Sequence, residues 1–184
     1  MKKLAAILTL GLAFVAQHAT AQDGTFGFTT LGGANARAFD TDGTTGLGSG
    51  FMTDILFTPT GGSAVSSAAT TFSDAATGYV LGGTTAITGT SPGQAGTYVH
   101  RAWEGTFASY DAAVAGGGKF GNSVDHVLTG QTPVSPSITL GGDATNFPQN
   151  VIGHASFKLV PEPTSIALGL LGLSGLAAAR RRRK

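Results

Sequence analysis

The feature that most constrains this chain is a series of short runs rich in Thr, Val, Ile, Tyr and Phe, separated by Gly, Ser, Thr and Pro. Such runs are typical of β-strands, and the residues between them are typical of turns. Because short strands without long helices between them bury one face each most simply in two layers, we predict an all-β domain, a single antiparallel β-sandwich, Ig-like or jelly-roll-like. The seven expected strands are residues 25–30, 52–58, 78–81, 84–88, 97–104, 137–140 and 152–159.

Two of these runs indicate how their side chains are arranged. In the last run, residues 155, 157 and 159 are apolar and alternate with polar neighbours, which predicts a half-buried strand with Phe157 in the core. In the run 97–104, Val99 and Trp103 share a face with Arg101 between them. We expect Trp103 to pack inside and Arg101 to lie at an edge or beside a carboxylate. One short helix is expected within residues 107–118, stopped by Gly116.

Composition limits how such a domain is stabilised and what it binds. The chain has 184 residues and no Cys, so a hydrophobic core and strand pairing must hold it together without disulfides. Residues 22–160, the expected secreted domain, contain four Lys and Arg against nine Asp and Glu, a net charge of −5. This acidic balance argues against binding to nucleic acid through phosphate neutralisation.

The N-terminal residues have the parts of a secretory signal. Lys2 and Lys3 precede a 13-residue, largely apolar stretch, residues 4–16, which is short for a bilayer span of about 20 residues. Ala19 and Ala21 then fit the small-x-small cleavage rule. We predict a signal peptide over residues 1–21, helical in the membrane and removed after Ala21 by signal peptidase.

The C-terminal residues combine a short motif, an apolar stretch and a run of cations. Residues 164–179 are sixteen uncharged residues, enough for a transmembrane helix of about 24 Å, at about 1.5 Å per residue. The positive-inside rule predicts that the cations remain cytoplasmic and stop transfer, which leaves the motif just outside the inner membrane. The motif is Pro161, Glu162 and Pro163, and the cytoplasmic stop is Arg180, Arg181, Arg182, Arg183 and Lys184.

This order of parts, "VPEPTSIALGLLGLSGLAAARRRRK", resembles the PEP-CTERM sorting signal of Gram-negative bacteria, a tail processed by the membrane enzyme exosortase. The resemblance implies that residues 161–184 are a sorting signal, that exosortase is a partner during export, and that the tripeptide is recognised by it. The alternative is a single-pass anchor that is never cut. The remainder, from "RAFDTDGTTGLGSGFMTDILFTPTGG" to "GHASFKLVPEP", is similar in order and spacing to small exported PEP-CTERM proteins of verrucomicrobia-like bacteria, which implies a shared sandwich and no site.

A few acidic, aromatic and histidine residues are candidates for a chemical site. The sequence Asp40-Thr41-Asp42-Gly43 matches the start of a calcium loop, but the further acidic ligands do not follow, so a plain turn is favoured. Glu104 and Asp111, near Trp103, could form a glycosidase pair beside a sugar platform, although Trp103 in the core and Glu104 at a strand end is the favoured interpretation. The scattered residues His100, His126 and His154 have no metal-binding spacing, and no nucleophile elbow, P-loop or dinucleotide fingerprint occurs.

The sequence therefore predicts an exported, cell-surface or extracellular-matrix-associated structural protein of a Gram-negative bacterium. We expect it to pass through an inner-membrane intermediate and to have no catalytic residues, metal or cofactor. The alternative is a carbohydrate-binding or adhesive module with extracellular polysaccharide as its partner. A weaker alternative is a glycoside hydrolase that uses Glu104 and Asp111.

Overall fold

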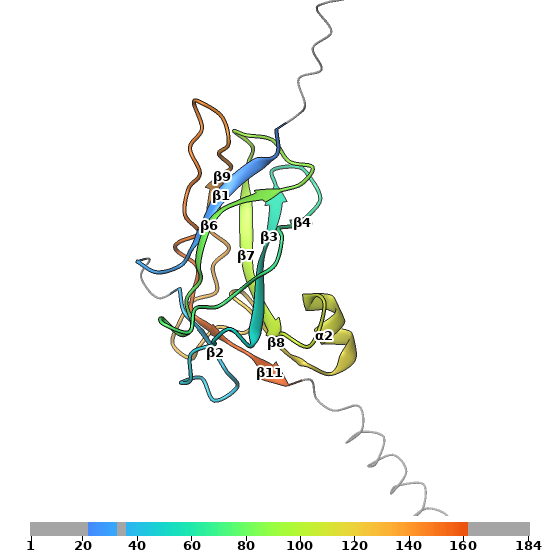
Figure 1. Ribbon diagram of the computed structural model, residues 1–184, viewed down its shortest axis with the longest axis vertical. Helices are drawn as coiled ribbons and strands as arrows, with labels where there is room; N and C mark the ends of the chain where they lie inside the picture. Colours follow the sequence, from blue (N-terminus) through green and yellow to red (C-terminus); the bar gives the residue numbers. More distant parts are fainter. Residues whose placement is uncertain (1–21, 33–35, 162–184) are drawn as a thin grey trace, which may run out of the picture.

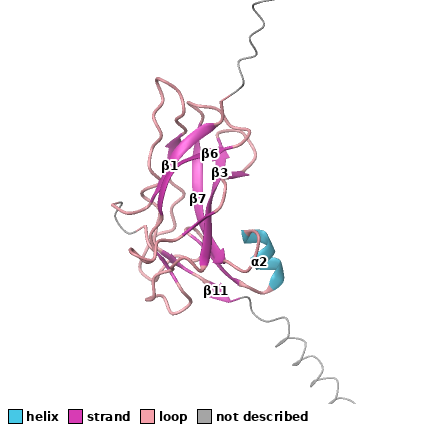
Figure 2. Cartoon of the chain, in the orientation of Figure 1, coloured by secondary structure: helices cyan, strands magenta, loops and turns pink. Residues whose placement is uncertain are grey.

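The computed structural model describes residues 22–32 and 36–161, which are mostly β-strand with one short helix (Figures 1 and 2). The predicted signal segment with Ala19 and Ala21, and the tail from Glu162 to Lys184, lie outside the described residues. Within the described ranges, no helix has the length and apolar character needed to cross a membrane. The described chain starts beside β1 and ends at β11, at opposite ends of the view in Figure 1.

The strands form one large sheet and two small ones. Seven strands, β3, β4, β5, β7, β8, β9 and β11, make an antiparallel sheet built around the long β3–β7 pair. β1 pairs with β6 in an antiparallel ribbon, whereas β2 and β10 pair in parallel. The bounds are β1 (Gly24–Thr29), β2 (Ala38–Phe39), β3 (Phe51–Pro59), β4 (Val65–Ser66), β5 (Thr70–Thr71), β6 (Leu81–Ile87), β7 (Ala95–Glu104), α2 (Tyr110–Gly116), β8 (Lys119–Asn122), β9 (Ser137–Thr139), β10 (Phe157–Lys158) and β11 (Val160–Pro161).

The predicted strand-rich class with antiparallel sheets is confirmed, and four of the seven runs lie within two residues of an observed strand at each end: β1, β3, β7 and β9. The predicted strand 78–81 is wrong over most of its length, because Gly78, with a positive φ of 85°, lies in a turn that the Tyr79 amide closes on the Ala76 carbonyl, and β6 begins only at Leu81. The predicted strand 152–159 is also wrong over its first half. Gly153, with φ of 92°, breaks the extended backbone, and regular pairing begins only at Phe157.

The main core lies between the β1–β6 ribbon and one face of the large sheet. The ring of Phe28 from β1 meets the ring of His100 from β7 edge-on, with centroids 5.7 Å apart. Ile55 pairs with His100, and Phe57 pairs with Tyr98, so these side chains share the face that the ribbon covers. Phe157 is fully buried in this core, as predicted.

The opposite face of the β3–β7 pair is covered at one end by α2, which is followed by β8, the strand beside β7 in the same sheet. The helix begins where the Ser109 hydroxyl accepts a hydrogen bond from the Ala112 amide at 3.1 Å, and it ends at Gly116, as predicted. Gly117 follows in the left-handed region, with φ of 73°, which suits a residue without a Cβ. Trp103 packs under this helix, so it is buried, as predicted, on the face away from the main core.

Candidate functional site

The segment that leads into the sorting tripeptide is held inside the fold. The amides of Phe157 and Leu159 donate to the carbonyls of Arg37 and Phe39 at 3.1 and 2.9 Å, and both side chains are fully buried. Between them, the amide of Lys158 donates at 3.0 Å to the carbonyl of His126, on the other side of the segment. The last residues before the tail are therefore fixed from two sides.

The final strand, β11, forms an end of the large sheet and contains the first residue of the tripeptide. Val160 lies opposite Phe120, and Pro161 lies opposite Lys119 of β8. Pro161 is exposed, and a proline suits an edge strand because it has no amide proton to donate to a further strand. Of the predicted sorting residues, Pro161 is thus part of the folded domain, whereas Glu162 and Pro163 lie outside the described residues.

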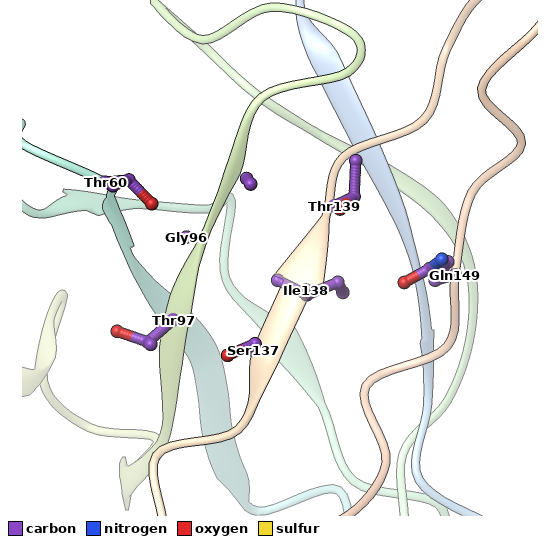
Figure 3. Close-up of a pocket in the computed structure, with 8 residues that line it drawn as sticks. Thr60, Gly96, Thr97, Ser137, Ile138, Thr139 and Gln149 are labelled. Carbon is purple, nitrogen blue, oxygen red and sulfur yellow. The ribbon is translucent and has the colours of Figure 1, made fainter.

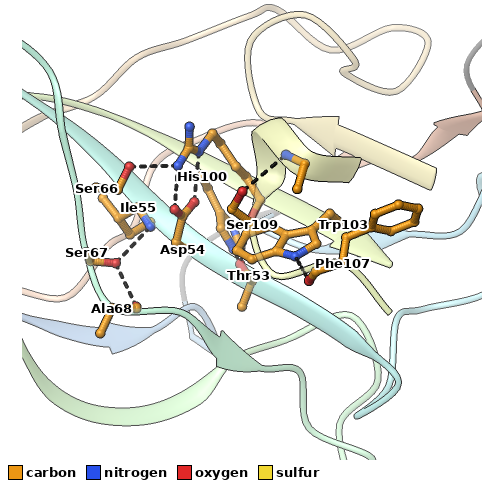
Figure 4. Close-up of polar contacts among 12 residues, drawn as sticks. Thr53, Asp54, Ile55, Ser66, Ser67, Ala68, His100, Trp103, Phe107 and Ser109 are labelled. Atoms are coloured by element: carbon orange, nitrogen blue, oxygen red, sulfur yellow. Dashed lines mark hydrogen bonds and ion pairs between the residues drawn. The ribbon is translucent and has the colours of Figure 1, made fainter. Parts of the chain in front are cut away.

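Arg101 meets a carboxylate, as one of the two predicted alternatives proposed. Its guanidinium forms a two-pronged ion pair with Asp54 of the neighbouring strand, and the Nε to Oδ1 distance is 2.8 Å (Figure 4). It also donates to the Ser66 hydroxyl at 2.8 Å and lies over the ring of Tyr110, 4.9 Å from its centroid. Burial raises the pKa of Asp54, and the hydrogen bonds from Arg101 oppose that shift. Both charged groups are buried, and each is neutralised by the other.

Two of the histidines meet in the core, although they are far apart in the sequence. Nδ1 of His100 lies 2.9 Å from Nε2 of His154, and Nε2 of His100 lies 2.6 Å from the Thr53 hydroxyl. The Thr53 hydroxyl donates to the Arg101 carbonyl at 2.7 Å, so it accepts from His100, whose Nδ1 accepts from His154. The Tyr98 hydroxyl lies 3.3 Å from Nδ1 of His154.

Burial keeps this histidine pair neutral. It lowers the pKa of His154 to about 4 and the pKa of His100 well below its usual value, with His154 contributing to the second shift. His126 lies elsewhere, beside the ring of Phe120. The described residues contain no group of three or more His, Asp or Glu side chains that could hold a metal ion.

The four carboxylates singled out from the sequence lie in four different settings. Glu104 ends β7, as predicted, and its Oε2 accepts a hydrogen bond from the Lys119 amide at 3.4 Å, whereas Asp111 lies exposed in the first turn of α2.

The two aspartates of the Asp-Thr-Asp-Gly stretch have partners of their own. Asp40 forms an ion pair with Lys119 at 2.9 Å. Asp42 closes its own turn by accepting from the Thr45 hydroxyl at 2.6 Å and from nearby amides, and these bonds lower its pKa. The predicted plain turn is therefore confirmed at residues 40–43.

A second feature, which the sequence did not reveal, is a hydroxyl-lined pocket on the large sheet (Figure 3). Thr58, Thr97 and Ser137 lie directly opposite one another across β3, β7 and β9, and all three are exposed. Residues from three separate runs meet here, so only knowledge of the strand pairing could have grouped them. We name this surface the hydroxyl face; its pocket is lined by Thr60, Ala95, Gly96, Thr97, Ser137, Ile138, Thr139 and Gln149.

The geometry defines a small all-β domain whose last strand runs directly into an apolar and basic C-terminal segment. That segment, residues 159–184, matches the PEP-CTERM protein-sorting motif. The chain thus carries a PEP-CTERM sorting motif, which implies processing by exosortase, passage through the membrane and export toward the cell surface. No curated protein and no solved structure matched the chain.

Proposed function

We propose that the mature domain is a structural, non-enzymatic protein of the cell surface or extracellular matrix, released from an inner-membrane intermediate in a Gram-negative bacterium. The proposal includes a β-sandwich in the mature domain, a signal peptide over residues 1–21 and a membrane-spanning helix within residues 161–184. The sorting motif supports the destination. One observation supports the structural role: the buried ionisable side chains are paired with one another.

Catalytic acids and bases need a reactive atom that faces a substrate. Here the buried charges of Asp54 and Arg101 neutralise each other, and His100 and His154 bond to each other. On the surface, Asp143 accepts hydrogen bonds from Thr145 and Asn146, which lower its pKa to about 2 and tie the carboxylate to its own loop. These groups are engaged in maintaining the fold, which favours a structural role over an active site.

One observation favours the carbohydrate-binding alternative. The hydroxyl face presents neutral donors and acceptors, and Gln149, which lines its pocket, lies two residues from Phe147. The side chain of Phe147 is 76% exposed, which is unusual for a large apolar residue. In this alternative, the neutral hydroxyl groups would hydrogen-bond to a sugar and the Phe147 ring would stack against it. Trp103, the aromatic residue considered from the sequence, is 1% exposed and cannot serve as that platform.

A polysaccharide pull-down with the mature protein from its native host separates these two functions. The structural role predicts weak retention on the host's extracellular polysaccharide that rises linearly with concentration and is unchanged in Phe147→Ala. Saturable binding that is lost in Phe147→Ala, but kept in the matched surface variant Leu31→Ala, would establish the carbohydrate-binding module instead. Leu31 is 49% exposed, so its replacement also removes exposed apolar surface, although less than the replacement of Phe147 does. Turnover of a glycan that disappears in Glu104→Gln, with the fold intact, would contradict the non-enzymatic proposal.

A further inference from the structure

The position of Pro161 in β11 bears on how exosortase reaches its motif. We propose that the form processed by exosortase is one in which β11 has separated from β8, so that local opening of the domain edge precedes tail removal. The proposal rests on the sorting function implied by the C-terminal motif. It adds a requirement on the folded domain, which the motif alone does not contain.

The first step is the lack of a linker. Pro161 is both the first residue of the tripeptide and the last residue of β11, so no residue separates the folded strand from the motif. The proposal requires a binding cleft in exosortase that contacts Pro161 along both edges. While β11 is paired with β8, Lys119 lies along one edge of Pro161. The folded domain therefore blocks one side of the first residue of the motif.

The second step is that β11 is weakly held. It has two residues, Val160 is only half-buried, and Pro161 is exposed. Strand β11 ends the sheet, so among the described strands it pairs with β8 alone. Segments with little buried apolar surface at a domain edge open locally without global unfolding. Separation of β11 is therefore accessible to the native protein.

The third step is that the opening has a defined limit. Leu159, the preceding residue, is fully buried, and its amide donates to the Phe39 carbonyl at 2.9 Å. Separation that stops at Leu159 frees two residues, which extend by about 7 Å at roughly 3.3 to 3.6 Å per residue. Pro161 thereby leaves the sheet while the core remains closed.

The test is a covalent lock in the full-length protein, expressed in a host that carries an exosortase. Phe120 and Val160 are directly opposite, at a separation that an antiparallel pair can bridge with a disulfide, and the chain has no Cys of its own. Oxidised Phe120→Cys/Val160→Cys should be processed at least ten-fold more slowly than wild type in a pulse-chase with mass detection of the tail. Reduction of the disulfide should restore processing.

Three controls make the outcome decisive. The lock Thr58→Cys/Thr97→Cys joins exposed, directly paired residues of β3 and β7, and it should be processed like wild type. Each single Cys variant should be processed normally, which separates the lock from the loss of the Phe120 ring. Insertion of Gly-Ser-Gly-Ser between Val160 and Pro161 should restore processing to the oxidised β8–β11 lock, because the linker supplies the reach that separation provides.

The proposal is overturned by normal processing of the oxidised β8–β11 lock, which would mean that exosortase binds β11 in place. It is equally overturned if the linker insertion fails to rescue the lock. A chain with all three tripeptide residues changed to Ala reports separately on the sorting function. Normal processing of that chain would remove the sorting function itself, whereas normal processing of the lock alone removes only the opening step.

Discussion

At the scale of single residues, Trp103 contributes most to the region under α2. Its ring is 1% exposed and stacks edge-on against Tyr110, and its Nε1 donates to the Phe107 carbonyl at 3.0 Å. Trp103→Ala should therefore lower the free energy of unfolding by roughly 3 to 5 kcal/mol, measured by urea denaturation. Trp103→Phe is the matched control and should cost less. A loss below about 1 kcal/mol for the Ala variant would contradict the buried position.

The buried histidine pair predicts that acid destabilises the domain. Because burial lowers the pKa of His154 to about 4 from 6.5, the unfolded chain binds a proton between these pH values that the folded chain does not. The contribution of His154 to the free energy of unfolding is then fully present above pH 6.5. It decreases toward pH 4 by about 1.4 kcal/mol per pH unit for this one proton. His154→Gln should reduce the slope of unfolding free energy against pH over this interval. An unchanged slope would mean that His154 titrates normally in the fold.

At the scale of elements, α2 depends on its first hydrogen-bonded turn. The Ser109 hydroxyl accepts from the Ala112 amide, and Asp111 adds a negative charge near the positive end of the helix. Ser109→Ala should lower the free energy of unfolding by about 1 kcal/mol, whereas Ser109→Asp should keep most of the stability. Urea unfolding of both variants provides the comparison. Equal losses in the two variants would show that the cap is not what stabilises α2.

The sequence predicted those elements that have a local signal. β3 and β7 were found because they are long and rich in β-formers, and α2 because Gly residues end it. The two-residue strands β2, β4 and β5 were missed, because strands this short exist only through their partners. The same holds for the candidate sites. The sorting tripeptide is contiguous and readable, whereas the hydroxyl face and the pair of His100 and His154 are created by long-range packing.

At the scale of the whole molecule, the folded domain and the C-terminal tail contribute separately to export and sorting. The domain folds around a core that includes residues up to Leu159, and the sorting motif covers residues 159–184. The folded domain and the sorting motif therefore overlap by a few residues, and Pro161 belongs to both. This overlap means that changes to the tail must be made after Leu159 if folding is to remain intact.

The last prediction concerns the tail itself. Changing Pro161, Glu162 and Pro163 to Ala removes the motif but keeps the sixteen uncharged residues and the terminal cations, so export and folding should proceed while the tail stays attached. In a host with an exosortase, this variant should accumulate in the inner membrane, as measured by membrane fractionation and mass spectrometry.

Deletion of residues 164–184 should have the opposite effect, because an apolar stretch of about 24 Å is then missing and nothing holds the chain in the bilayer. The domain should be recovered soluble from the periplasm and should not reach the surface. The two variants together separate recognition from retention, since one keeps the proposed membrane segment without the motif and the other keeps the motif without the proposed membrane segment. If the triple-Ala variant is trimmed and localised like wild type, the tripeptide has no role in sorting. If the tail stays attached in the wild-type protein as well, the tail acts as an ordinary membrane anchor.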